Sequence, residues 1–290
     1  ELFSDLFGNW REWRFSHYRR GWQGNAIVTE VEGRVVGFAT WHTEGKVGIV
    51  GENAVHPSFQ GRGLGAAQIR KVLEILKGEG CICARVHTNL DPAHGPARAQ
   101  YRKAGFSIRL RNSLYHNSLR HLPRIPPPEG VEVVPAGPER KEEVARLAHE
   151  IWGPIFESVR ETLGDLLFSV CFADALERKV SDLVARASKG GEGRLLLALW
   201  RGEPVGLAAL DSDEGRALGT ISALGVSPRH RGKGIGTALC MEAFSLFSEA
   251  GLRHARLVAG PGEDNEVTRD FCWRLGLYRE IPGVDMFATL

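Results

Sequence analysis

Residues 55–65 read V-H-P-S-F-Q-G-R-G-L-G, and residues 226–236 read V-S-P-R-H-R-G-K-G-I-G. The chain therefore carries the same glycine-rich motif, here called the glycine phrase, twice. Each phrase follows an apolar stretch typical of a strand and precedes an amphipathic stretch typical of a helix. Glycines at such a junction let the backbone curl around a ligand, and the first amides of the helix can bind phosphate. The repeat therefore predicts two phosphate-binding turns.

The repeat extends on both sides of the glycine phrases. Segments 25–40 and 194–210 have the pattern of two hairpins, with tight turns at Gly33 and Gly202. Each copy is expected to continue with a helix (63–78 or 234–250), a strand (81–87 or 254–259), a second helix (96–104 or 265–275) and two closing strands. This alternation of strands and helices around a mixed sheet predicts an α/β fold for each copy.

A proline-rich stretch, H-L-P-R-I-P-P-P-E-G at 121–130, separates the two copies. Prolines can neither continue a helix nor donate to a sheet, so the stretch is interpreted as an extended linker. We predict one domain over 1–120 and another over 131–290. The second begins with a strand at 131–135 and helical patterns at 138–152 and 159–189. The first lacks a matching strand and helix, which either precede residue 1 or have been lost; we favour the former.

Composition limits the classes of protein to consider. The chain has 290 residues, is 43% hydrophobic and 25% charged, and carries a net charge of +2, which is typical of a soluble globular protein and argues against a nucleic-acid surface. Its 5 cysteines show no C-x-x-C pattern, which favours reduced thiols in a cytoplasmic protein. The histidines show no ligand spacing, so we expect no metal. We also expect no membrane partner, and a monomer or homodimer.

Two common phosphate motifs do not fit the glycine phrases. A dinucleotide fingerprint requires G-x-G-x-x-G, whereas both turns read G-x-G-x-G. A P-loop requires an upstream glycine and a hydroxyl residue after the lysine, and Gly232-Lys233 has neither.

Both phrases fit V-x-P-x-x-[QR]-x-x-G-x-G after a hairpin, and Tyr101 to Phe106 reads Y-x-x-x-G-F. In these features the chain resembles the GNAT superfamily of acyl-CoA N-acyltransferases, over most of residues 25–118 and 131–290. The tandem arrangement is similar to that of mycothiol synthase, although the acid tyrosine lies in the other copy here. The resemblance implies two tandem domains, each with a centrally splayed mixed sheet, that use acetyl-CoA or another acyl-CoA to acylate a primary amine of a small molecule or peptide.

The resemblance also implies a cofactor site in each copy. Backbone groups near Val55 and Val226 would bind the pantetheine arm and polarise the thioester. A polar residue seven positions before the acid often contacts the arm, and it is His94 in the first copy and Asn265 in the second. The expected cofactor-binding residues are Val55, Gln60, Gly61, Arg62, Gly63, Gly65, Ala66 and His94 in the first copy, and Val226, Arg231, Gly232, Lys233, Gly234, Gly236, Thr237 and Asn265 in the second.

Direct attack by an amine requires a base for its proton and an acid for the departing thiolate. By resemblance the acid is Tyr101 in the first copy, and Cys272 holds the same position in the second. Glu52 is the candidate base of the first copy, whereas the second would depend on Ser222, Asp211 or an ordered water. Sequence leaves open which copy is active. The alternative function is an acyl-CoA sensor in which one or both copies bind the cofactor without turnover.

Overall fold

The computed structural model describes residues 25–190, 194–263 and 265–290. The start of the first copy, where the absent strand and helix would precede the hairpin, lies outside these residues. The chain forms two compact units, and neither is continuous in sequence. The N-terminal unit contains residues 25–111, 161–172 and 282–290, and the C-terminal unit contains the other described residues between 112 and 281.

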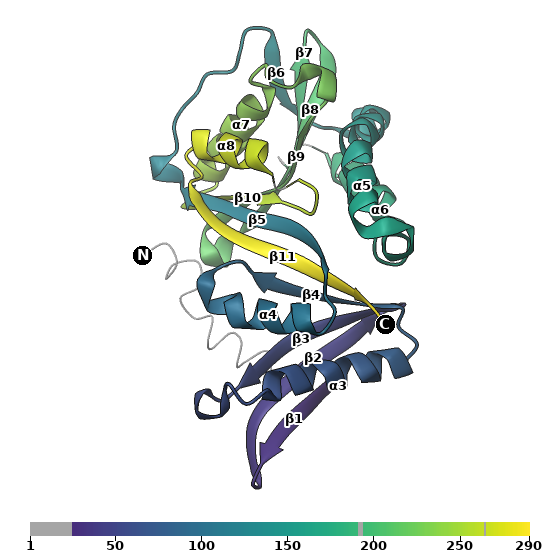
Figure 1. Cartoon of the computed structure of the whole chain (residues 1–290). Coiled ribbons are helices and arrows are strands. Elements are labelled where there is room, and N and C mark those ends of the chain that lie inside the picture. The colour runs from purple at the N-terminus through teal and green to yellow at the C-terminus, as the bar shows by residue number, and fades with distance from the viewer. Residues whose placement is uncertain (1–24, 191–193, 264) are drawn as a thin grey trace. The chain divides into compact units, whose positions relative to one another are not determined.

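The N-terminal unit is a mixed sheet with strand order β1-β2-β3-β4-β11 (Figure 1). Its strands are β1 (Asn25–Val31), β2 (Arg34–Glu44), β3 (Val47–Val55), β4 (Cys83–Asn89) and the later part of β11 (Arg279–Thr289). Its helices include α3 (Leu64–Gly78) and α4 (Gly95–Lys103). The pair β3–β4 is parallel, and the other pairs are antiparallel.

The core of this unit follows from helical and strand periodicity. Ile69, Val72 and Leu76 recur on one face of α3 and are fully buried. They pack in one cluster with side chains of the sheet, including Val50 of β3 and Val86 of β4. Burial of this apolar face fixes α3, and therefore the glycine turn before it, against the sheet.

The C-terminal unit is a six-stranded sheet with order β5-β10-β9-β8-β7-β6. Its strands are β5 (Ile108–Ser118), β6 (Val131–Pro135), β7 (Leu195–Trp200), β8 (Glu203–Asp213), β9 (Leu218–Val226) and β10 (His254–Ala259). Its helices include α6 (Ala175–Ser188), α7 (Ile235–Glu249), α8 (Glu266–Arg274) and the first part of α5 (Lys141–Cys171), which passes into the N-terminal unit after residue 160. Figure 1 shows α7 and α8 on one face of this sheet and α5 and α6 on the other.

Strand β7 explains why helices cover both faces. Leu195 and Leu197 belong to the apolar cluster formed with α5 and α6, whereas Leu196 and Ala198 belong to the cluster formed with α7. Successive strand side chains point to opposite faces, so a continuous apolar run needs cover on both sides.

The predicted hairpins are confirmed. At the two turns Glu32 and Gly33 have φ of 51° and 75°, and Arg201 and Gly202 have φ of 53° and 86°. Two consecutive positive φ values are the geometry of a type I′ turn, whose twist matches that of the flanking strands.

The prediction of two closing strands in each copy is wrong. Each copy ends in one long strand, and the two copies exchange it. Residues 113–118 of β5 pair with β10 in the C-terminal unit, and residues 283–289 of β11 pair with β4 in the N-terminal unit. Local pattern identifies a strand but not its partner, because any edge of suitable length can accept it.

The helices after the linker also differ from the prediction. The pattern predicted a break after residue 152, but α5 continues through Pro154 and departs from helical geometry at Gly164, where φ is 75° and ψ is 158°. Apolar side chains on both sides of Pro154, among them Trp152 and Val159, are buried. Tertiary packing therefore retains a helix that proline alone would interrupt.

Candidate active site

The two parallel strands at the centre of the N-terminal unit separate towards the glycine turn. Pairing between β3 and β4 ends at Val50 and Val86, although β3 continues to Val55 and β4 to Asn89. The gap between the diverging ends lies directly before the first glycine phrase. Backbone groups that no longer pair between two diverging strands can bind the amides of an extended and largely neutral chain.

A β-bulge causes this separation. On the other side of β3, Ala39 pairs with Asn53 and Trp41 with Val50, so Gly51 and Glu52 together oppose Thr40. The Thr40 hydroxyl accepts a hydrogen bond from the Glu52 amide at 2.8 Å and donates one to the Glu52 carbonyl at 3.1 Å. A bulge bends the strand that contains it and increases its twist, which turns the end of β3 away from β4.

The C-terminal unit has a β-bulge at the corresponding place. Pairing between β9 and β10 ends at Ile221 and Leu257, and Ser222 is the extra residue between the pairs formed by Ile221 and Ala223 with β8. Strand β9 then continues to Val226. Both sheets are therefore splayed at their centre, as the resemblance implied.

The polar residue that begins each glycine turn contacts the end of the preceding strand. Gln60 Nε2 donates to the Val55 carbonyl at 3.0 Å, and Arg231 Nε donates to the Val226 carbonyl at 3.3 Å. This shared contact explains why either Gln or Arg can occupy the position, since both side chains donate. It fixes the turn relative to the splayed strand.

The first turn is open to a ligand. Gly63, with φ of 79°, is the residue before α3, and Gly61 has φ of 77°. A Cβ atom at either glycine would meet no atom within 4 Å. The first amides of α3 have no partner within the helix and carry the positive end of its dipole. This turn can therefore receive a diphosphate.

The second turn is partly covered by the linker. A Cβ atom at Gly234, the residue before α7, would lie 2.7 Å from Cγ of Pro128. The Lys233 ammonium lies 5.2 Å from the centre of the Trp200 ring, in a cation–π contact. Gly232 has open space around its Cα, as Gly61 does.

The remaining predicted cofactor residues lie near the turns. Gly65 and Ala66 are in the first turn of α3, and Gly236 and Thr237 are in the first turn of α7. Arg62 donates to the Ser58 carbonyl at 3.3 Å. A Cβ atom at Gly65 would lie 2.6 Å from the Gln100 side chain, so this glycine lets α4 approach α3 closely.

His94 and Asn265 already have protein partners. His94 Nδ1 lies 2.6 Å from Asp91 Oδ2, and both side chains are partly exposed. Asn265 caps α8, because its side-chain oxygen accepts a hydrogen bond from the Thr268 amide at 3.0 Å. A contact with the cofactor arm remains a prediction for both residues.

Tyr101 places a hydroxyl group at the splayed part of β3. The ring is buried in the core of the N-terminal unit, and the hydroxyl donates to Asn53 Oδ1 at 2.7 Å. Burial raises the pKa of Tyr101 to about 12, because the phenolate would lose its hydration. At neutral pH the side chain is therefore a fully protonated donor, as a general acid must be.

Cys272 occupies a different environment. Its side chain is fully buried in the apolar cluster between α7, α8 and the sheet. Burial raises the pKa of the neighbouring Cys240 thiol, and the proximity of Cys272 adds to this shift. A thiol in this core has the surroundings of a packing residue.

The candidate bases also differ between the copies. The Glu52 side chain is half-buried on the bulge of β3. Asp211 forms an ion pair with Arg186 at 2.8 Å. Burial acts to raise the pKa of Asp211, but hydrogen bonds from Ser222 and Arg186 and the charges of Arg186 and Arg194 outweigh it and lower the pKa. This ion pair makes Asp211 a poor proton acceptor.

The sequence matches the model of the Acetyltransferase (GNAT) family over residues 1–106 and 156–277. The chain belongs to the GNAT family. Comparison with curated proteins gives no match.

Solved GNAT structures share the fold of the whole chain. A GCN5-related N-acetyltransferase from Sphaerobacter thermophilus has a TM-score of 0.62 at 18% identity, covering 99% of this chain and 91% of that one. A tandem GNAT protein from the clavulanic acid biosynthesis pathway has a TM-score of 0.53 at 20% identity, covering 92% and 82%. The glucosamine N-acetyltransferase region of a fungal multi-domain GH3 β-N-acetylglucosaminidase has a TM-score of 0.61 at 17% identity, covering 98% of this chain and 36% of that one. The chain thus consists of two GNAT-type domains.

One polar residue at the GNAT site was not among the predicted site residues. Asn53 follows Glu52 on the bulge and is the hydrogen-bond partner of Tyr101. Its place next to Glu52 was the sole signal in the sequence. The contact joins residues that lie 48 positions apart, so only the fold could reveal it.

Within the described residues, no group of three or more His, Cys, Asp or Glu side chains could hold a metal ion. None of the helices in this part of the chain is long and apolar enough to cross a membrane.

Proposed function

We propose that this GNAT protein is an acetyl-CoA-dependent N-acetyltransferase, and that its N-terminal copy carries the reaction. The observation that supports this is the position of the Tyr101 hydroxyl. It lies 2.7 Å from Asn53, on the splayed strand that leads into the open turn of Gly61 and Gly63. A proton donor therefore lies beside a slot for the pantetheine arm and next to a turn for the diphosphate.

The residues of the first copy suit an acyl-CoA. The amides at the start of α3 and the Arg62 guanidinium would hold the diphosphate. Backbone groups near Val55, where β3 and β4 no longer pair, would bind the amides of the pantetheine arm. When bound, acyl-CoA supplies a thioester with a carbonyl carbon that an amine can attack.

The proposed reaction is direct attack in a ternary complex. The amine nitrogen forms a bond with the thioester carbonyl carbon, and the carbon–sulfur bond breaks. Tyr101 donates its proton to the departing sulfur, and Glu52 takes the proton that the amine loses, directly or through water. The net result is an amide and a free thiol, and the proton that Tyr101 loses is restored from the one that Glu52 received.

The second copy is proposed not to catalyse transfer. Its acid position is the core residue Cys272, and Pro128 lies over its glycine turn. The similarity to acetyltransferases favours turnover by the protein as a whole over the alternative of an acyl-CoA sensor. We therefore expect one strong acetyl-CoA site for each chain.

Tyr101→Phe tests this assignment, with Tyr278→Phe as the matched control. Tyr278 is 56% exposed, so its hydroxyl should not matter. Calorimetric titration with acetyl-CoA should give similar affinity for both variants, while release of free thiol should fall by about 10²–10⁴-fold in Tyr101→Phe alone. Full activity in Tyr101→Phe would refute the role of Tyr101, and Cys272→Ala would then be the next variant.

The acceptor is proposed to be a primary amine of a small molecule or peptide. One similar structure is described as a glucosamine N-acetyltransferase region, so glucosamine is a reasonable first acceptor. Amino acids, aminoglycosides and peptide N-termini complete the screen, and a compound counts as an acceptor if its acetylated product forms together with the free thiol.

A further inference from the structure

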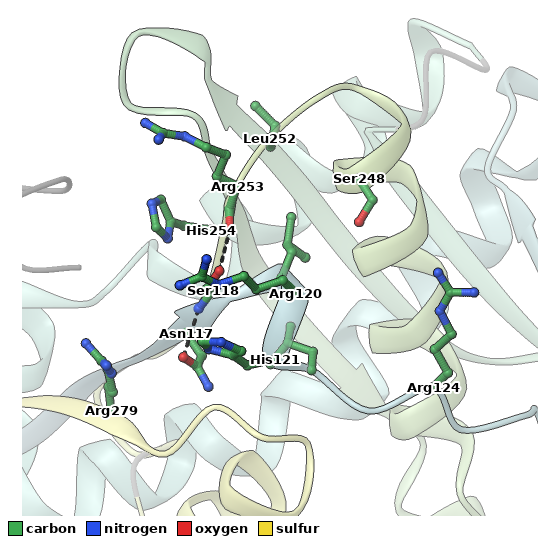
Figure 2. A pocket seen from close by; sticks show the side chains of 12 residues that line it. Asn117, Ser118, Arg120, His121, Arg124, Ser248, Leu252, Arg253, His254 and Arg279 are labelled. Atoms are coloured by element: carbon green, nitrogen blue, oxygen red, sulfur yellow. Dashed lines mark hydrogen bonds between the residues drawn. The ribbon is translucent and has the colours of Figure 1, made fainter. Parts of the chain in front are cut away.

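A pocket with a strongly basic lining lies in the C-terminal unit, away from the glycine turn of that unit. Its volume is about 710 Å³, which is ample for a small molecule. It is lined by Asn117, Ser118, Leu119, Arg120, His121, Leu122, Arg124, Ser248, Leu252, Arg253, His254 and Arg279. Arg120 and Arg124 come from the segment after β5, Arg253 directly precedes β10, and Arg279 begins β11. Figure 2 shows Arg120, Arg253 and Arg279 on one side of the view and Arg124 apart from them.

Among the described residues, no acidic side chain pairs with the arginines of this pocket. Among the described residues that line the pocket, none is Asp or Glu. The described part of the chain provides no ion pair for Arg120, Arg124, Arg253 or Arg279. Since the whole chain has a net charge of only +2, this concentration of positive charge is local. Four guanidinium groups around one cavity repel each other unless an anion lies between them.

The backbone beneath these arginines is held rigidly. The Asn117 side chain is buried, donates to the Gly276 carbonyl at 2.7 Å and accepts from the Ser118 amide at 2.8 Å. The Arg253 carbonyl accepts from Ser118 Oγ at 3.3 Å and from the Leu119 amide at 2.9 Å (Figure 2). The cationic side chains therefore extend from fixed positions, which lowers the entropic cost of ligand binding.

The positive charge near the pocket also affects the pKa of a buried histidine. His116 is buried on β5, next to Asn117. Burial lowers the pKa of His116 to about 4, and the charges of Arg279, Arg256 and His254 contribute to the shift. The positive potential thus reaches the strand that forms one side of the pocket.

The pocket is distinct from the phosphate-binding turn of its own unit. It contacts α7 near its C-terminal end, at Ser248, whereas the glycine turn precedes its N-terminal end. A helix of this length spans roughly 20 Å. The dipole is negative at the C-terminal end, so an anion bound here would depend on the arginines and not on the helix.

We propose that this pocket binds a small ligand that carries a di- or triphosphate group, independently of acyl-CoA. The planar fork of an arginine fits phosphate oxygens with two hydrogen bonds, and several forks can hold a chain of phosphates from different sides. An inorganic polyphosphate and a nucleoside triphosphate share this chemistry. The ligand would occupy the C-terminal unit, which holds the copy of the fold that lacks the acid tyrosine.

Calorimetric titration of the full chain with inorganic tripolyphosphate tests the proposal. The titration is run at physiological salt, with and without saturating coenzyme A, so that the glycine turns can be filled beforehand. We expect one site that persists with coenzyme A present. The double variant Arg253→Gln, Arg279→Gln should weaken binding at least about tenfold. All of the substituted side chains are exposed, so a thermal unfolding scan should show that this variant is folded.

The matched control is Arg146→Gln with Arg178→Gln, which removes the same charge from exposed positions on α5 and α6. Equal weakening in both double variants, unchanged binding in the pocket variant, or no binding to the parent would each overturn the proposal. A repeat with adenosine triphosphate distinguishes the two sources of the phosphate group. Tighter binding than tripolyphosphate indicates a nucleotide, and equal binding indicates that phosphate alone is recognised.

Discussion

Tyr101 illustrates how one residue acquires its chemistry from its surroundings. The phenol is kept protonated by burial, and its hydroxyl is aimed at the splayed strand by Asn53. Sequence located the tyrosine because the motif that ends helix α4 is local. The partner of its hydroxyl lies on another element and depended on the fold.

The raised pKa of Tyr101 predicts a dependence of stability on alkaline pH. The phenol titrates at 10.0 in the unfolded chain and at about 12 in the folded one. Between these values the unfolded state releases the proton and the folded state keeps it, so raising the pH favours unfolding. The free energy of unfolding should fall by roughly 1.4 kcal/mol for each pH unit from this residue. Tyr101→Phe should lack this part of the fall when denaturant unfolding is followed from pH 9 to 12.

Tyr278→Phe is again the control, because an exposed phenol should titrate alike in both states. Parallel curves for the parent and Tyr101→Phe would mean that the hydroxyl is hydrated in the native protein. The donor role would then need another explanation.

At the scale of elements, the β-bulge on β3 controls the opening between the central strands. Thr40 is 3% exposed, and its hydroxyl contacts both backbone groups of Glu52. The bulge is therefore held by one side chain of the neighbouring strand. Nothing in the local sequence indicates this contact, because a threonine on a strand is ordinary.

Thr40→Val should loosen the bulge while retaining the shape of the side chain. Two backbone groups of Glu52 lose their partner, so the free energy of unfolding should fall by about 1–3 kcal/mol. Affinity for acetyl-CoA should fall as well, because the slot between β3 and β4 widens or closes. Denaturant unfolding and calorimetry measure the two effects. Thr43→Val, at the exposed end of β2, is the control and should change neither quantity.

The linker is a second element, and its contacts depend on the fold. Its prolines predicted an extended connection, yet Pro128 lies against the turn before α7. Pro128→Gly should uncover this turn and add a second, weaker acetyl-CoA site in a calorimetric titration. Pro126→Gly serves as the control for the loss of a proline from the same exposed stretch. Two equal sites in the parent protein would show that Pro128 does not obstruct binding.

At the scale of the whole molecule, the exchange of closing strands makes each unit depend on distant parts of the chain. Strand β11 completes the N-terminal sheet, and its Phe287 is fully buried. The Phe172 ring lies 6.3 Å from that of Phe287, so the residue directly after α5 contributes to the same packing. The unit with Tyr101 is thus incomplete without residues from the last third of the sequence.

Phe287→Ala should therefore destabilise the N-terminal unit by about 3–5 kcal/mol. Loss of acetyl-CoA turnover on mild heating should accompany the drop, although the substitution lies far from Tyr101 in sequence. Thr289→Ala, at the exposed end of β11, is the control. An isolated fragment of residues 1–120 should fail to fold for the same reason, as measured by circular dichroism, and a folded fragment would contradict the exchange.

The sequence by itself determined the glycine turns, the hairpins, the order of elements from each hairpin to the second helix of its copy, and the GNAT resemblance. These features depend on residues close together in the chain, where backbone preferences and hydrophobic periodicity act. Tertiary structure alone decided the partner of each closing strand, the contact of Tyr101 with Asn53, the position of Pro128 over the turn before α7, and the arginine pocket. Each of these joins residues that are distant in the chain, and local preferences cannot select between alternative long-range partners. Packing of the complete core makes that selection, because only one arrangement buries the apolar faces and satisfies the strand edges together.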